Sequence, residues 1–150
     1  LIWLLVVASG CGPSERIVAT EKLLSVEYSD RMADYIRVLI SEGAEVNARG
    51  TNDLTPLMIA AGNSSTPEIV ALLIEKGAEL EARDNNGWTP LMLAAGNSST
   101  PEIVQLLIEK GAEVNARSTI GLTPLMFAAG NPNGKSVEIK QLLIDAGATE

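Results

Sequence analysis

A segment of 34 residues that occurs in near-duplicate constrains the fold of this chain more than any other feature. The tetrapeptide Thr-Pro-Leu-Met occupies residues 55–58, 89–92 and 123–126, with a spacing of 34 residues both times. Residues 55–88 and 89–122 are identical at 26 of 34 positions. Repeats of this length form units that cannot bury their apolar face alone and therefore stack on their neighbours.

Each copy predicts two short helices. Pro56 stands at the start of the first helix, where its missing N–H costs nothing, and Gly62 can end that helix in a left-handed conformation. The second helix begins with a cap at Ser65 or at Thr66, and Gly77 supplies its left-handed end. Apolar residues at positions i, i+3 and i+4 give this second helix one buried face.

The residues that join one copy to the next have the chemistry of a turn. The stretch Arg83-Asp84-Asn85-Asn86-Gly87 contains Asn-Gly, which is the strongest short signal for a tight turn. Asp53 replaces that glycine in the preceding copy and can also adopt a left-handed conformation. We therefore expect a projecting β-turn, a finger, between successive units.

These residues resemble the ankyrin repeat, with its Thr-Pro-Leu start, its Leu-Leu-x-x-Gly-Ala tail and the Asn-Ala pairs at 47–48 and 115–116. The resemblance implies an all-α fold, an ankyrin-repeat solenoid of stacked helix-turn-helix units joined by β-turn fingers. It covers residues 21–150 as about four repeats: 21–54, 55–88, 89–122 and 123–150. The usual histidine after Thr-Pro-Leu is replaced by methionine, which can fill the gap only by packing.

Residues 21–54 resemble a degenerate first copy. The segment Glu21-Lys22-Leu23-Leu24 stands where Thr-Pro-Leu-Met is expected, so we place the first helix there. A terminal repeat faces solvent on one side, and Glu21, Lys22, Glu27 and Asp30 suit that polar outer face.

The N-terminus carries a second signal. Residues 1–7 are an apolar run too short to span a bilayer, and small residues follow it up to Cys11. This segment resembles the lipobox of bacterial lipoproteins, although Ala8 stands where leucine is usual and no Met or basic region precedes it. The resemblance implies that residues 1–10 are a signal peptide clipped at its start and that Cys11 carries the lipid. Residues 11–20 then form a short tether.

The lipobox implies a position on the bacterial cell envelope, lipid-anchored and facing the periplasm, on the outer membrane if the host is Gram-negative. Gly12 after the cysteine, rather than Asp, favours that membrane by the same resemblance. The alternative is that residues 1–7 form a cap strand or helix packed on the first repeat.

Composition excludes several classes of site. The chain has no histidine and one cysteine, so it offers no Ser-His-Asp or Cys-His arrangement and lacks the commonest metal ligand. Its net charge of −8 disfavours binding to nucleic acid. We therefore expect no enzyme activity, no catalytic residues, no metal and no cofactor.

The candidate binding residues are those that lie in the fingers and differ between copies. Ankyrin proteins bind partners through finger tips, and Leu54, Trp88 and Leu122 each precede Thr-Pro, so they form an apolar row with one residue per repeat. Trp is enriched at binding hot spots. The alternative for this row is packing on the neighbouring finger. The other candidates are a basic row at the finger bases and the variable tip residues: Arg49, Arg83, Arg117, Asn85, Asn86, Thr119 and Ile120.

The predicted function is a non-enzymatic protein-protein interaction module displayed on the cell envelope. The expected partners are a protein with an apolar centre and an acidic rim, and the lipid bilayer through the acylated cysteine. The alternative for the arginines is solvated surface or pairing with Asp84 and nearby glutamates. The alternative function is an inhibitor or immunity-type protein that blocks a partner enzyme.

Overall fold

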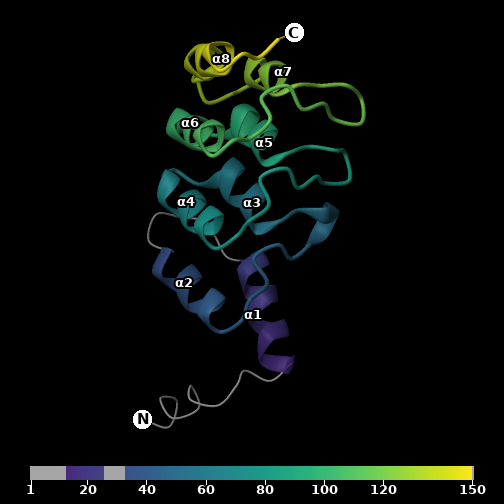
Figure 1. Ribbon diagram of the computed structural model, residues 1–150, viewed down its shortest axis with the longest axis vertical. Helices are drawn as coiled ribbons and strands as arrows, with labels where there is room; N and C mark the ends of the chain where they lie inside the picture. The colour runs from purple at the N-terminus through teal and green to yellow at the C-terminus, as the bar shows by residue number, and fades with distance from the viewer. Residues whose placement is uncertain (1–12, 26–32, 150) are drawn as a thin grey trace.

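Pairs of α-helices are stacked along the long axis of the computed structural model, which describes residues 13–25 and 33–149 (Figure 1). No strand occurs among these residues, and the expected all-α ankyrin solenoid is confirmed. The helices are α1 (Pro13–Ser25), α2 (Ala33–Ser41), α3 (Pro56–Asn63), α4 (Pro67–Glu75), α5 (Pro90–Asn97), α6 (Pro101–Glu109), α7 (Pro124–Ala129) and α8 (Ser136–Asp145), with a 3-10 helix, η1 (Thr51–Asp53).

The core is continuous from one repeat to the next. Helix α5 packs between α3 and α7, while α6 packs between α4 and α8. Leu57 and Leu91 are buried, and so are the alanines at 60, 61, 94 and 95. Because alanine has the smallest side chain that still favours a helix, the first helices approach each other closely. Each repeat therefore completes the core of its neighbours.

The first helix of each copy begins as the sequence predicts. Thr55, Thr89 and Thr123 are N-caps whose side chains each accept a hydrogen bond from a methionine N–H, and proline follows each cap. The second helices begin at Pro67 and Pro101, so Thr66 rather than Ser65 is the N-cap. Its hydroxyl makes no capping bond to the helix.

The glycines divide into two kinds. Gly77 has φ +92°, so its expected left-handed turn is confirmed. The expectation for Gly62 was wrong, because α3 continues through it to Asn63. At the equivalent Gly96, a Cβ atom would lie 3.1 Å from Cδ1 of Phe127, so glycine there permits close packing of α5 against α7. At Gly62 itself the nearest atom would lie at an ordinary contact distance of 3.7 Å.

The N-terminal helix differs from the expected first repeat. Helix α1 begins at Pro13, so residues 13–20 are helical rather than a tether, and Glu21–Leu24 lie near its end rather than at a helix start. Ala19 and Leu23 are buried in the core, which holds this helix in place, while Glu21 and Lys22 are exposed.

Residues 1–12, with the proposed signal peptide and Cys11, lie outside the described residues, as do Glu27 and Asp30. No helix in the described part of the chain is long and apolar enough to cross a bilayer.

A polar side chain after the second helix links each loop to the next repeat, and it is asparagine in two of three copies. Asn47 donates to Gly77 O (3.0 Å) and accepts from Glu79 N–H (2.8 Å). Asn115 repeats both bonds, to Gly147 O and from Thr149 N–H. Glu81 holds this position in the middle copy, and its carboxylate accepts from Glu113 N–H but cannot donate to Gly111 O.

We expect Glu81→Asn to increase the free energy of unfolding by about 0.5–1.5 kcal/mol, because it restores the missing bond to Gly111 O. Urea denaturation of the two proteins measures the difference. Glu79→Gln is the matched control, because it removes a neighbouring negative charge without adding a bond between repeats. Equal effects of the two substitutions would contradict the hydrogen-bond explanation.

Candidate protein-binding surface

Three fingers project from the same side of the stack, beyond the first helices (Figure 1). Their closing bonds run from Gly50 N–H to Leu54 O (2.9 Å), from Asp84 N–H to Trp88 O (3.1 Å) and from Ser118 N–H to Leu122 O (2.9 Å). We name residues 49–54, 83–88 and 117–122 the first, second and third fingers.

A left-handed residue turns the chain at each tip. Gly87 and Gly121 have φ +72° and +83°, and Asp53 takes the same conformation at +66°. The expected tolerance of Asp53 for this conformation is therefore confirmed.

Side chains inside the fingers hold the turns. Asp84 is buried, and its Oδ1 accepts from the backbone N–H groups of Asn86 and Trp88, both at 2.8 Å. Ser118 Oγ accepts from Leu122 N–H at 3.1 Å in the third finger. Gly50 offers no such acceptor, and the first finger contains η1 instead. The variable residues 84 and 118 therefore shape the fingers rather than face a partner.

Successive fingers are hydrogen-bonded to each other through their backbones. Asn85 N–H donates to Asn52 O (3.1 Å), and Thr119 N–H donates to Asn86 O (3.0 Å). The Thr119 hydroxyl donates to the same carbonyl at 2.8 Å. Thr119 and the Asn86 backbone therefore take part in stacking, while the exposed side chains of Asn85 and Asn86 lie at the tips.

The predicted basic row links the fingers. Arg49 Nη1 donates to Asp53 O (3.1 Å) and to Arg83 O (2.6 Å). Arg83 Nη1 donates to Gly87 O (3.3 Å) and to Arg117 O (2.7 Å). We name this chain of bonds the arginine ladder. It explains why arginine recurs every 34 residues, since only a long side chain with several donors reaches two fingers at once.

The arginines nevertheless remain at the surface. Arg49, Arg83 and Arg117 are exposed, and Arg49 Nη1 lies 3.5 Å from a carboxylate oxygen of Asp53. The expected alternative of pairing with Asp84 does not describe Arg83, whose hydrogen bonds in the structure go to carbonyl groups. The basic row therefore both stacks the fingers and carries positive charge on their surface.

The apolar row is half-buried rather than fully exposed. Leu54 and Trp88 pack against a small core of Met58, Ala82 and Leu93. The Trp88 ring also meets Phe127 edge to face, with 5.1 Å between ring centroids and 81° between planes. Leu122 is half-buried as well. Trp88 thus stabilises the stack through packing on the neighbouring repeat and presents only part of its ring.

Ile120 is a predicted site residue whose large apolar side chain is highly exposed. Its side chain is 77% exposed at the tip of the third finger, where Asn52 and Asn86 occupy the equivalent positions. An apolar side chain in this position has no packing role within the described chain. Ile120, with exposed neighbours Asn85, Asn86 and Thr119, is the accessible apolar centre of the finger surface.

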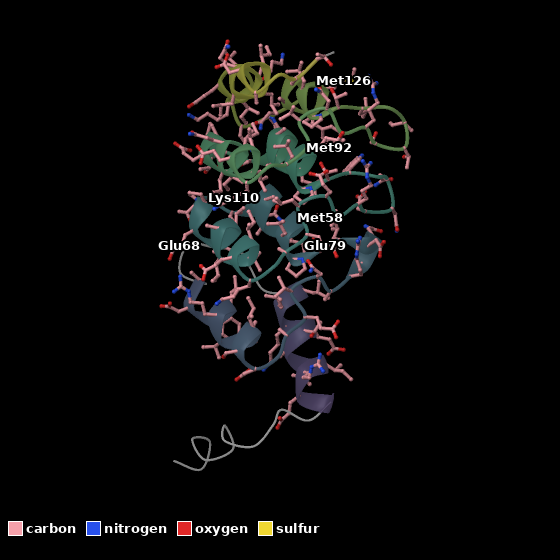
Figure 2. The ribbon with its side chains drawn as sticks, viewed as in Figure 1. Met58, Glu68, Glu79, Met92, Lys110 and Met126 are labelled. Carbon is pink, nitrogen blue, oxygen red and sulfur yellow. The ribbon has the colours of Figure 1, made fainter. Side chains whose placement is uncertain are left out.

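Asn52 in the first finger and Met126 on α7 are also exposed, and neither was predicted as a site residue. Met126 is 42% exposed on α7, while the equivalent Met58 and Met92 are fully buried (Figure 2). Identical residue types gave no sequence signal for this difference, because it depends on which of the described repeats pack over each methionine. Asn52 could have been found by its equivalence to Asn86 and Ile120.

Comparison with known proteins agrees with this geometry. A family model described as ankyrin repeats, in three copies, matches residues 24–118. The matched segment makes up more than half of the chain and includes the first two fingers. No curated protein matches the chain.

We expect Arg83→Met to lower the free energy of unfolding by about 1–2 kcal/mol, because it removes the bonds to two fingers but keeps the apolar stem. Arg117→Met should cost less than about 0.5 kcal/mol, because Arg117 Nη1 makes one long bond, to Gly121 O at 3.4 Å. Chemical denaturation compares the two. Each substitution removes one positive charge, so equal losses would show that charge rather than the ladder is responsible.

Proposed function

The chain belongs to the ankyrin-repeat family, and we propose on that premise that it binds a protein partner through its fingers while displayed on the bacterial cell envelope as a lipoprotein. Ankyrin repeats are generally protein-protein interaction modules without catalytic activity. The exposure of Ile120 at a finger tip carries the proposal, because apolar side chains held in the open by a rigid scaffold are typical anchors of protein interfaces.

The partner fits a surface with an apolar centre and positive flanks. Ile120 and the accessible part of Trp88 contribute the apolar centre, and the guanidinium groups of Arg83 and Arg117 lie at the finger bases beside it. A matching partner presents an apolar pocket or patch edged by carboxylates. The hydrogen-bonded fingers are ordered before binding, so little conformational entropy is lost when the partner docks.

The envelope position rests on the sequence of the N-terminus. An apolar run and small residues lead to Cys11, the one cysteine of the chain. Acylation there tethers the stack to a lipid bilayer, facing the periplasm and on the outer membrane in a Gram-negative host. Helix α1 begins two residues later, so the first repeat sits close to the membrane and the third finger lies farther along the stack (Figure 1).

We expect Ile120→Asn to weaken partner binding about tenfold or more, because it removes the apolar centre of the surface. The substitution places at residue 120 the side chain that residue 86 already carries, so the finger should fold normally. Capture from an envelope extract, followed by titration with the recovered partner, gives the change in Kd.

The matched control for Ile120→Asn is Ile17→Asn, which removes an equally apolar side chain that is 59% exposed on α1. Equal losses for both variants, or no loss at residue 120, would overturn the finger surface as the binding site. Assay of the recovered partner's own activity with and without the chain separates a general interaction module from an inhibitor or immunity-type protein.

We expect Cys11→Ser to abolish labelling by a fatty-acid analogue in a bacterial host and to move the protein from the membrane to the soluble fraction. A second variant, Cys11→Ser with Ser99→Cys, keeps one thiol but places it in an exposed loop outside the motif. It should also remain unlabelled. Unchanged membrane retention of Cys11→Ser would contradict the anchor.

A further inference from the structure

Exposed apolar side chains are unevenly distributed along this chain. Helices α3 to α6 carry no large apolar side chain that is highly exposed, whereas α1 and α2 at the N-terminal end of the stack carry four. These are Ile17, Val18, Tyr35 and Val38, which are between 39% and 59% exposed. We name these four residues the α1–α2 face, because the two helices that bear them pack against each other.

The α1 half of this face takes no part in stacking the repeats. The ankyrin match begins at residue 24, so nearly all of α1 precedes the repeats. Ala19 and Leu23, which are four residues apart and therefore share one side of the helix, are buried in the core. Ile17 and Val18 remain exposed. Their exposure therefore belongs to a helix that stands outside the repeat pattern, rather than to an unfilled position for another repeat.

The α2 half is also separate from the core. Ile36 is buried, while Tyr35 and Val38 are exposed and, being three residues apart, lie on the same side of the helix. Arg37 extends toward the following repeat, where its Nη2 lies 3.9 Å from a carboxylate oxygen of Glu68 on α4. The side of α2 that faces the next second helix thus carries Arg37, and the apolar pair lies on a different side.

The charges of the chain favour contact of this end, rather than of the remaining stack, with a lipid surface. Helices α1 and α2 together contain three acidic and three basic side chains, so their side-chain charges cancel. Residues 42–150 contain 14 acidic and seven basic side chains. Anionic lipid headgroups therefore repel the later repeats but not the two helices that carry the α1–α2 face.

The sequence places the α1–α2 face next to the proposed lipid. Gly12 alone separates Cys11 from the first residue of α1, and two residues of extended chain span at most about 7 Å. Ile17 lies about 6 Å along the helix from Pro13. Figure 1 shows this first turn of α1 at the end of the stack opposite to α7 and α8. A lipid on Cys11 therefore cannot hold α1 far from the bilayer.

We propose that the α1–α2 face docks on the lipid bilayer and orients the stack so that the third finger is held away from the membrane. Ile17, Val18 and Val38 contact the boundary of the acyl chains, and Tyr35 lies among the headgroups, where tyrosine is enriched. This inference rests on the proposed acylation of Cys11. So short an anchor holds the face beside the bilayer at an effective concentration of roughly millimolar, so a few apolar side chains suffice for docking.

A bilayer fits this face better than the nearest apolar segment of the chain itself. Residues 1–7 are that segment, but the lipobox resemblance implies that they are removed with the signal peptide. Contact with lipid also accounts for the balanced charge of the two helices, which the packing of α1 and α2 does not require. The apolar side chains of this end and the exposed Ile120 therefore have separate roles.

The test supplies the anchor chemically. The methyl-labelled full chain is coupled through Cys11, its one thiol, to a maleimide-bearing phospholipid in nanodiscs of phosphatidylethanolamine and phosphatidylglycerol. Nitroxide-labelled lipid in the disc broadens the NMR signals of side chains at the bilayer. We expect strong broadening at the methyl groups of Ile17, Val18 and Val38. Ile120, at the tip of the third finger, should keep sharp signals. The full chain is used so that residues 1–7 can compete for the face.

Matched variants decide whether the face itself is responsible. Val18→Ser combined with Val38→Ser should reduce the broadening at Ile17 about threefold or more, because two apolar contacts with lipid are lost. Val137→Ser is the matched control, because it changes a valine that is 82% exposed on α8, and it should leave the broadening at Ile17 unchanged. All three valines are exposed, so the variants should fold normally.

Several outcomes would contradict docking by this face. They are absence of broadening at Ile17, equal broadening at Ile17 and Ile120, and equal effects of the double variant and Val137→Ser. Nuclear Overhauser contacts between the Trp3 ring and Ile17 would instead assign the face to residues 1–7. Concentration-dependent shifts of the Ile17 methyl in the uncoupled Cys11→Ser chain would assign it to a second copy. Because the lipid is attached chemically, the labelling experiment on Cys11→Ser decides natural acylation separately.

Discussion

Contact between neighbouring repeats is the constraint on which the whole structure depends. No helix pair in the described part of the chain encloses a core of its own, because the buried leucines and alanines of all pairs belong to one continuous cluster. The same rule governs the polar groups. Asn47, Arg83 and Thr119 all bond to groups 30 or more residues away, across one repeat boundary. Every interface is thus both apolar and hydrogen-bonded, as expected for a stack that is stable only through its neighbours.

Because each repeat depends on its neighbours, a residue that recurs in every repeat can serve stacking as well as binding. An arginine that recurs at every finger base has the pattern of a basic binding strip, yet its first role is to join two carbonyls of successive fingers. Much of the Trp88 ring likewise packs against Phe127 and the small core around Met58. These packing roles leave the finger tips accessible, because the hydrogen-bonded fingers hold Ile120 and the side-chain amides at the tips on a rigid edge. Stacking and the proposed recognition therefore share the same surface.

The ends of the stack behave differently from its middle. At the N-terminal end, α1 departs from the repeat register, and its Leu24 lies close to Gly50 at the base of the first finger. At the C-terminal end, Lys140 replaces a buried valine on the second-helix side, while Met126 and Arg117 keep the residue types of internal repeats. The proposed lipid anchor at Cys11 belongs to the N-terminal side of the sequence, so it is compatible with proposed partner binding at the third finger.

The sequence alone determined the repeat unit, the threonine caps, the proline starts and the finger turns, because these depend on local backbone chemistry within one copy. The end of the first helix was misjudged at Gly62, because the helix continues through this residue to Asn63 without a left-handed turn. The exposure of Ile120 and the half-burial of Trp88 could be established only from the tertiary structure. Both residues lie in the fingers, and the repeat pattern does not indicate how far each side chain is covered. Three methionines in identical motifs differ in burial, because a later repeat packs over Met58 and Met92, whereas no later repeat among the described residues packs over Met126. Such differences depend on the position of each repeat in the stack, which the sequence of a single repeat does not specify.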